Sequence, residues 1–292
     1  MRRVRLFCDW DRNSWELIQE LKKQTPFLTP NNCYEGIQFV HDNSYDYAVI
    51  FNTTRERVIT PHNKNIVLIL EPPEIMKMMY GRTGLNGTFS SKTYSFAQDD
   101  YHEWAPGLGF TTVDYEPPAP LVSLKPRKAC MMCSNKVFTD YHAKRRQVFS
   151  ALLESDLDID FYGRGMELVP GDERVKGEIP FGTKRDVYQN YAWCIDFENS
   201  PHGVVTDKFF DPLFSGTVPI TNAMVAPSIA PDRSYELIDF GASTDSIVKR
   251  IDGILKTSAL WKYDKPVSYM AKQFAMGQFN LTKWISDRIM EL

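Results

Sequence analysis

The sequence lacks any apolar run long enough to cross a membrane. A membrane-spanning helix needs about 20 consecutive apolar residues, and no run approaching that length occurs among the 292 residues. The first residues, Met1–Arg5, lead straight into a short β-like stretch without the hydrophobic segment of a signal peptide. We therefore expect a soluble, cytoplasmic protein, in which the glycosylation sequons at Asn52, Asn86 and Asn280 are chance matches.

The sequence also has few residues that hold metals or form disulfides. Its five cysteines are odd in number, and its five histidines are scattered. Cys130 and Cys133 form a C-x-x-C pattern, but the pattern lies in an apolar run, has no second copy, and has His142 as its nearest histidine. We expect reduced thiols, with Cys130–Cys133 in a buried strand. Metal binding or redox use of this pair is the alternative.

Two D-x-D patterns are the remaining candidates for a metal–nucleotide site. They lie at Asp9–Asp11 and Asp156–Asp160. Such triplets are common by chance, and strand alternation would place the acids of the second on one solvent-facing side. The sequence therefore assigns no metal ligand, and a metal-dependent reaction at one of these runs is the weaker alternative.

No strong excess of charge of either sign is present. The formal net charge is −3, which argues against a general nucleic-acid-binding protein, although a local basic cleft is compatible with it. Internal repeats and low-complexity tracts are also absent. Aromatic residues make up 13% of the chain, which suits stacking on sugars or bases, but an aromatic core is the commoner explanation.

What the sequence does contain is an alternation of short β-like and longer helical patterns. Strands are expected at 4–8, 37–40, 45–51, 65–70, 130–133, 159–162, 193–197, 218–221 and 236–238, and helices at 14–21, 140–154, 184–191, 206–214 and from 243 onward. The polar residues 84–105 are expected to form a loop region over a cleft, and 110–113 to close the first sheet. Such alternation favours parallel sheets with helices on both faces.

The length of the chain and a proline-rich segment predict two domains. A chain of 292 residues is long for one core, and the three prolines within 117–120 exclude a helix or a central strand there. We predict an α/β protein with two Rossmann-like domains that face each other across a cleft. The predicted boundaries are 1–118 for the first domain, 119–128 for the linker, 129–275 for the second domain, and 276–292 for a helix that packs back on the first.

A turn between a predicted strand and helix concentrates charged residues. Thr206 is a suitable N-cap and Asp207 complements the positive helix end, whereas a lysine at Lys208 is mildly unfavourable at that end. A diphosphate would compensate the lysine, held by Lys208 together with the free N–H groups of the helix. A solvated lysine, or an ion pair with Glu198, is the alternative.

A second basic feature begins the helix predicted at 140–154. Arg145 and Arg146 precede its apolar residues, so their side chains are candidates to reach the carboxyl edge of the sheet. The planar guanidinium suits phosphate oxygens. A plain charged helix face is the alternative.

Glu71 is the candidate general base. It follows an apolar strand directly and precedes two prolines that stiffen the turn. A carboxylate at the end of a buried strand, facing a cleft, can have a raised pKa and accept a proton. Glu74 is the neighbouring competitor for this role.

Together these segments resemble the α-1,3/4-fucosyltransferases of glycosyltransferase family 10. That family carries a strand ending in Phe-Glu-Asn-Ser/Thr, then Val-Thr-Glu-Lys, then a helix leading to a Gly-Thr-Val/Ile-Pro-Ile strand. The matching segments here are Phe197–Ser200, Val205–Lys208, Gly216–Ile220, Ser234–Phe240, Ser134–Asn135 and Arg145–Leu152. The resemblance covers about 130–240, and in the first half it rests on Glu71–Pro73.

The resemblance implies a GT-B fold and an inverting transferase that moves fucose from GDP-fucose to a glycan hydroxyl without a metal or other cofactor. The first domain would bind the acceptor, an oligosaccharide or glycoprotein glycan and not a nucleic acid, and the second the nucleotide sugar. Lys208 and Arg145 would neutralise the diphosphate leaving group, and Glu71 would deprotonate the acceptor. The donor-binding residues would be Arg146, Glu198, Asn199, Ser200, Val204, Thr206, Asp207 and Lys208.

Three departures from the family pattern lie near the expected donor. Asp207 replaces the usual glutamate, Val204 stands in place of tyrosine, and Thr221–Ala223 replace an aromatic, glycine-ended segment. We therefore expect the grip on the diphosphate to be kept and the sugar pocket to differ, which leaves open another donor such as UDP-xylose. A non-catalytic sugar- or nucleotide-binding module is the alternative from another class. The lack of a membrane anchor separates the chain from Golgi relatives and indicates a bacterial enzyme, or a viral one in the host cytoplasm.

Overall fold

The chain folds into two compact units, which we describe one at a time. The computed structural model describes residues 1–24, 28–81, 92–96, 103–104, 127–165, 171–180, 183–201, 203–230, 234–257 and 280–292. One unit comprises Met1–Phe110, His202–Val205 and Ala275–Leu292, and the other comprises Thr111–Pro201 and Thr206–Phe274. Most of the predicted linker at 119–128 and the predicted strand at 110–113 lie outside the described residues.

The first unit is built on a seven-stranded sheet with the order β2-β3-β1-β4-β5-β6-β7. Its strands are β1 (Arg2–Phe7), β2 (Cys33–Tyr34), β3 (Ile37–Val40), β4 (Tyr47–Phe51), β5 (Asn65–Ile69), β6 (Lys92–Ser95) and β7 (Glu103–Trp104). Every pairing is parallel except the antiparallel pair of β2 and β3. The prediction that 84–105 is a loop is wrong for β6 and β7, because short strands can be polar and their pairing is not visible in composition.

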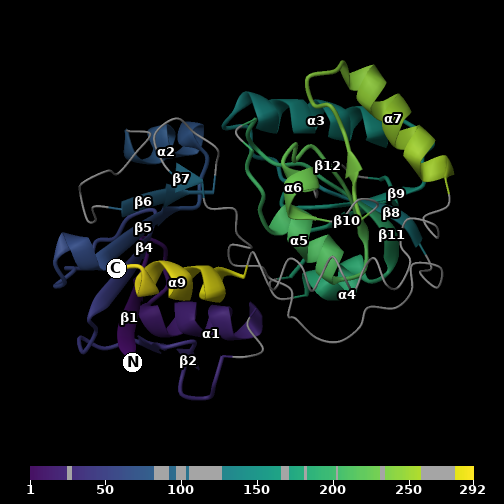
Figure 1. The fold of residues 1–292 in the computed structure, drawn as a ribbon. Coiled ribbons are helices and arrows are strands. Elements are labelled where there is room, and N and C mark those ends of the chain that lie inside the picture. Colours follow the sequence, from purple (N-terminus) through teal and green to yellow (C-terminus); the bar gives the residue numbers. More distant parts are fainter. Residues whose placement is uncertain are drawn as a thin grey trace. The chain divides into compact units, whose positions relative to one another are not determined.

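Helices cover both faces of this first sheet (Figure 1). α1 (Ser14–Gln24) and α9 (Leu281–Met290) pack on one face, where Leu17, Ile285 and Ile289 join the apolar side chains of β1 and β4. α2 (Pro73–Tyr80) packs on the other face through Met76. A short 3₁₀ helix, η1 (His62–Lys64), precedes β5.

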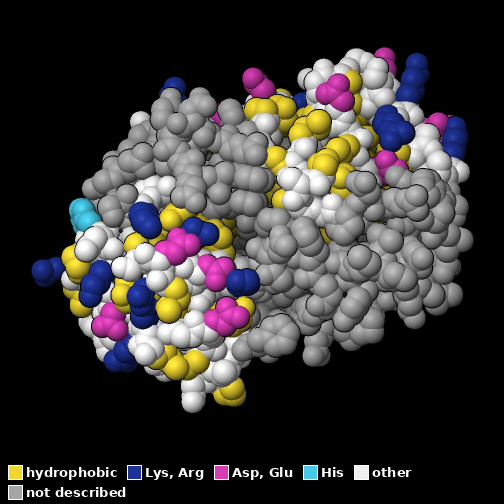
Figure 2. All heavy atoms as spheres, viewed as in Figure 1, with side chains coloured by type: hydrophobic (Ala, Val, Ile, Leu, Met, Phe, Trp, Pro, Cys, Tyr) yellow, Lys and Arg dark blue, Asp and Glu magenta, His cyan; other side chains and the backbone are white. Residues whose placement is uncertain are grey.

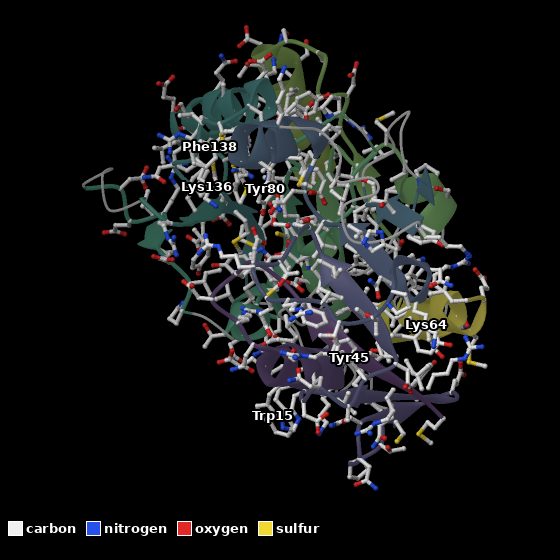
Figure 3. All side chains as sticks on the ribbon, turned by 90° about the vertical axis from the view of Figure 1, so that its left-hand side faces the viewer. Trp15, Tyr45, Lys64, Tyr80, Lys136 and Phe138 are labelled. Atoms are coloured by element: carbon white, nitrogen blue, oxygen red, sulfur yellow. The ribbon has the colours of Figure 1, made fainter. Side chains whose placement is uncertain are left out.

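Trp15 departs from the apolar face of α1. Its position matches the helical spacing of Leu17, Ile18 and Leu21, which are buried, yet it is 45% exposed. Figure 3 shows Trp15 at the edge of the molecule. Its ring instead packs edge-on against His41 at 5.3 Å.

The second unit is built on a six-stranded parallel sheet with the order β10-β9-β8-β11-β12-β13. Its strands are β8 (Arg127–Met132), β9 (Ile159–Tyr162), β10 (Val175–Gly177), β11 (Tyr191–Asp196), β12 (Val218–Thr221) and β13 (Glu236–Leu237). β10 was not predicted. The helix expected at 184–191 ends earlier, because Tyr191 already pairs with β8 as the first residue of β11.

Helices again cover both faces of the second sheet (Figure 1). α3 (Asp140–Leu153) and α7 (Thr244–Lys256) pack on one face and share a core with apolar residues of β8, β9, β11 and β12. α4 (Lys184–Tyr188), α5 (Asp207–Phe214) and α6 (Ala226–Ile229) complete the unit. Pro212 lies inside α5, and Gly216 has a φ of +69° just after it, a conformation that favours glycine at a helix end.

The surface carries charges of both signs. In Figure 2 the described Lys and Arg side chains are interspersed with Asp and Glu side chains over the visible face. Among the described residues, no helix has both the length and the apolar character required to span a membrane.

Candidate functional site

The carboxyl ends of β8, β11 and β12 bring polar side chains together at one edge of the second sheet. In parallel α/β sheets this edge is where ligands bind. Glu198 and Asn222 follow β11 and β12, and Ser134 follows β8. Asn222 pins the backbone of Glu198, because its Oδ1 accepts the Glu198 N–H at 2.7 Å and its Nδ2 donates to the Glu198 carbonyl at 3.3 Å.

Thr206 caps α5 and holds the carboxylate of Glu198. The Thr206 N–H donates to Oε1 at 2.7 Å, and the hydroxyl lies 2.9 Å from Oε2. The same hydroxyl accepts the Lys208 N–H at 3.3 Å, which is the N-cap bond expected of a threonine. Burial raises the pKa of Glu198, while Lys208 and the Thr206 N–H lower it in part.

Lys208 lies between two carboxylates at the start of α5. Its Nζ is 3.9 Å from Oε2 of Glu198 and 3.6 Å from Oδ1 of Asp207, and its side chain is 21% exposed. Burial alone would lower the pKa of Lys208, but the charges of Asp207 and Glu198 raise it overall. The lysine is therefore protonated, and the ion pair with Glu198 that the sequence left open is present in the ligand-free structure.

Arg145 is buried and faces the same edge of the sheet. Its Nη1 donates to Oδ1 of Asn199 at 2.8 Å and to the carbonyl of Phe197 at 3.4 Å, and its Nη2 donates to Oγ of Ser134 at 3.3 Å. With 4% of its surface exposed, it is not part of a solvated helix face. Within the described structure its Nε has no hydrogen-bond partner.

The other predicted donor residues, Arg146, Ser200 and Val204, lie in different surroundings. Arg146 lies over the ring of Phe149, with its Cζ 5.5 Å from the ring centroid. Ser200 is 5% exposed. Val204 is also buried, and its segment belongs to the first unit.

His142 is a neighbour that the sequence analysis did not assign to the site. Its Nδ1 lies 2.8 Å from the hydroxyl of Thr139, the N-cap of α3, and that hydroxyl also donates to the carbonyl of Asn199 at 3.1 Å. Burial, followed by the charges of Arg145 and other cations, lowers the pKa of His142 to about 4, so the imidazole is neutral near pH 7. The exposed side chains of Lys136 and Phe138 lie near it on the connection from β8 (Figure 3).

Lys184, Asp196 and Asp211 are further charged residues that the sequence analysis missed. Lys184 Nζ lies 2.5 Å from Oδ2 of Asp207 and 3.1 Å from Oδ2 of Asp211. Asp196 ends β11 and is 4% exposed, and burial raises its pKa well above the usual value, against the lowering effect of Lys208 and Lys184. Charged residues inside an apolar strand and helix were the available signal, since charges are rarely buried unless they are paired.

Glu71 lies in the first unit, at the carboxyl end of β5. The N–H of the preceding Leu70 donates to Oδ1 of Asn52 at 2.8 Å, which fixes the end of the strand. Glu74, the competitor, lies in the first turn of α2. The hydroxyl of Tyr80 donates to the carboxylate of Asp9, and burial and the charges of Asp9 and Glu71 raise the pKa of Tyr80.

The remaining motifs are the C-x-x-C pattern, the D-x-D runs and the glycosylation sequons. Cys130 and Cys133 are buried free thiols, as predicted, with Cys130 inside β8. In the second D-x-D run, Asp160 accepts a hydrogen bond from the Tyr191 hydroxyl at 2.6 Å.

In the part of the chain that the structure describes, no cluster of three or more His, Cys, Asp or Glu residues is arranged to hold a metal ion. Asn52 and Asn280 are buried, and the sequon at Asn86 lies outside the described residues.

Comparison with known proteins places this geometry in a family context. Residues 122–264 match the family model described as glycosyltransferase family 10 (fucosyltransferase), C-terminal part. No curated protein matches the chain.

Three solved structures share the fold of nearly the whole chain. An alpha1,3-fucosyltransferase solved with GDP is 15% identical, with a TM-score of 0.54 over 98% of this chain and 91% of the other. An alpha-glucosyltransferase in complex with UDP is 9% identical, with a TM-score of 0.63 over 99% and 100%. A DNA-modifying beta-glucosyltransferase is 10% identical, with a TM-score of 0.60 over 99% and 100%.

These likenesses confirm the GT-B fold and the resemblance drawn from the sequence. Residues 122–264 match the C-terminal part of glycosyltransferase family 10, and the chain is a glycosyltransferase of the GT-B fold that resembles the fucosyltransferases of that family.

Proposed function

We propose that the chain transfers a single sugar from a nucleoside diphosphate sugar to a glycan hydroxyl, with inversion at the anomeric carbon and without a metal. The observation that carries this proposal is the placement of Lys208 at the N-terminus of α5, with Arg145 bonded to Asn199 beside it. Two cations, the buried Arg145 and the partly buried Lys208 at a helix N-terminus, suit an anionic diphosphate.

In the reaction, the donor diphosphate departs with the electron pair of its bond to the sugar. Lys208 and Arg145 stabilise the negative charge that develops on it, which is the task that a metal ion performs in other transferases. Glu198 and Asn199 hold the donor. Because Thr206 and Asn222 already fix Glu198, the donor site requires little rearrangement on binding.

Glu71 takes the proton of the acceptor hydroxyl while the oxygen attacks the anomeric carbon from the side opposite the diphosphate. A single displacement of this kind inverts the configuration. A general base contributes about 10²–10⁴-fold to such a step. Glu71 and Lys208 belong to different units, as this division of roles requires.

GDP-fucose is the first candidate donor, and a UDP-pentose such as UDP-xylose is the second. The buried Thr221 and Asn222 lie at the end of β12 and directly after it, and they favour a sugar pocket that differs from that of the fucosyltransferases. The acceptor is proposed to be an oligosaccharide or glycoprotein glycan, because the net charge of −3 and the mixed surface charges give little attraction to a nucleic acid.

A thermal-shift screen against GDP- and UDP-sugars tests the donor. We expect one nucleotide sugar to raise the melting temperature, and the same compound to release its nucleoside diphosphate when oligosaccharides are added. Full activity in EDTA and an inverted product anomer by NMR are expected. Binding without release in any acceptor mixture would favour the non-catalytic module, and release only with duplex DNA would replace the glycan acceptor.

A further inference from the structure

Five charged side chains of alternating sign form a row at the start of α5, which we call the charge row: Glu198, Lys208, Asp207, Lys184 and Asp211. The successive closest distances are 3.9 Å, 3.6 Å, 2.5 Å and 3.1 Å. Each inner member of the row contacts two groups of the opposite charge.

Lys184 is the lysine of the charge row that has no proposed contact with the donor. It is the first residue of α4, whereas both of its carboxylate partners lie on α5, so it also ties the two helices together. Asp211 has no exposed surface, and Lys184 Nζ lies at ion-pair distance from it. Burial alone would lower the pKa of Lys184, but Asp207 and Asp211 raise it overall, so the lysine is charged.

Asp207 is shared unequally between the two lysines. Its Oδ2 lies 2.5 Å from Lys184, while its Oδ1 lies 3.6 Å from Lys208. Burial raises the pKa of Asp207, yet the charges of Lys184 and Lys208 lower it overall, with Lys184 the larger of the two. Lys184 therefore compensates most of the negative charge of Asp207. The contacts of Lys208 with the carboxylates of Asp207 and Glu198 are longer.

We propose that Lys184 is a positioning residue of the donor site, which satisfies Asp207 and so leaves Lys208 available to the donor diphosphate. This inference rests on the proposed function, because it assumes that Lys208 binds the diphosphate. Lys184 itself acts through Asp207 and has no assigned contact with the sugar.

Charge counting around the row supports the same role. Three cations, Arg145, Lys184 and Lys208, lie near four acidic side chains, of which Asp196, Glu198 and Asp211 are buried and Asp207 is 30% exposed. Without Lys184, Asp207 would lose its closest cation, and an incoming diphosphate would compete with Asp207 for Lys208. Charges that interact in a site of low dielectric are strongly coupled.

The test measures the affinity of the protein for GDP and UDP by calorimetry. Whichever of GDP and UDP the wild type binds, Lys184→Met is expected to lower the affinity for it by ~10-fold. This is the size of coupling seen between contacting charged groups. Lys184→Arg should retain affinity. Lys256→Met is the matched control, because Lys256 is a 72% exposed lysine of the same unit that pairs only locally with Asp252.

A double variant separates positioning from folding. In Lys184→Met/Asp207→Asn the carboxylate that competes for Lys208 is gone, so part of the lost affinity should return even if the melting temperature does not. A lower melting temperature with unchanged affinity in Lys184→Met would show a structural role and overturn the inference, as would the absence of recovery in the double variant.

Two further variants keep the outcome decisive. If Lys184→Met does not fold, Asp211→Asn removes the other carboxylate of Lys184, and affinity should then be unchanged or tighter; a large loss would contradict the proposal. Lys208→Ala tests the proposed function itself. If Lys208→Ala binds nucleotide as the wild type does, the proposed function fails, whatever Lys184 does.

Discussion

Arg145 and Asn199 are joined by a hydrogen bond of 2.8 Å between Nη1 and Oδ1. The bond links the first half of α3 to the residues that follow β11, so it fixes a helix and a sheet edge with respect to each other. The guanidinium also reaches Phe197 and Ser134, and it does so from two separate nitrogens, whereas a lysine would have only one.

Arg145→Lys should therefore impair both folding stability and transfer. A lysine keeps the charge but cannot span the three acceptors, and it would leave buried polar groups without partners. We expect a fall in melting temperature together with a loss of turnover of about tenfold or more. Thermal unfolding and steady-state kinetics measure the two effects, and unchanged kinetics in a folded variant would remove Arg145 from the donor site.

Lys208→Ala should nearly abolish transfer. Removal of one group that stabilises transition-state charge typically costs about 10²–10³-fold in turnover. The assay is the release of nucleoside diphosphate, with Lys256→Ala as a control that removes a charge from an exposed site of the same unit. Near-normal turnover of Lys208→Ala would contradict its contact with the diphosphate.

Glu71→Gln should spare donor binding and lose transfer, because glutamine keeps the size of the side chain but cannot accept the proton. Glu74→Gln is the matched variant, two residues into the next helix by position. If Glu74→Gln loses transfer and Glu71→Gln keeps it, Glu74 is the base. Donor affinity and transfer rate, measured on both, distinguish these outcomes.

We expect the protein to lose stability in acid because of His142. Its pKa is about 4 in the folded chain and about 6.5 when unfolded, so between these values the unfolded chain binds more protons and acid favours unfolding. The free energy of unfolding should fall by about 2–3 kcal/mol from this group as the pH drops from 6.5 to 4. Urea melts of His142→Gln should show a shallower decline over that window. An identical slope would mean that His142 does not contribute.

Gly163→Ala should destabilise the second unit strongly. Gly163 has a φ of +145°, and a Cβ there would lie 1.8 Å from the carbonyl oxygen of Cys133. We expect a cost of at least about 3 kcal/mol in the free energy of unfolding. Gly171→Ala is the control, since its φ is +90° but no atom lies within 4 Å of the added Cβ, and it should cost only about 1 kcal/mol. Equal costs would contradict the close approach to Cys133.

Local chemistry made much of the second unit predictable. Thr206 caps α5 because its hydroxyl can accept a backbone N–H, and Gly216 follows the helix because glycine tolerates a positive φ. The strands β9 and β12 begin and end at the residues predicted for them. These signals lie within a few residues of each other, so the sequence alone contains them.

Local signals did not predict the polar strands β6 and β7. They also did not predict which residues pair with the buried charges. These strands depend on pairing with residues elsewhere in the chain, which their own composition does not encode.

The sequence by itself therefore determined the α/β alternation, the family resemblance and the positions of Lys208 and Arg145, because each is written in a short motif. Only the tertiary structure decided that Lys184 and Asp211 extend the charged site and that His142 stays neutral beside it. The physical reason is that burial and charge pairing arise when separate elements pack, and both set the protonation and orientation of a side chain.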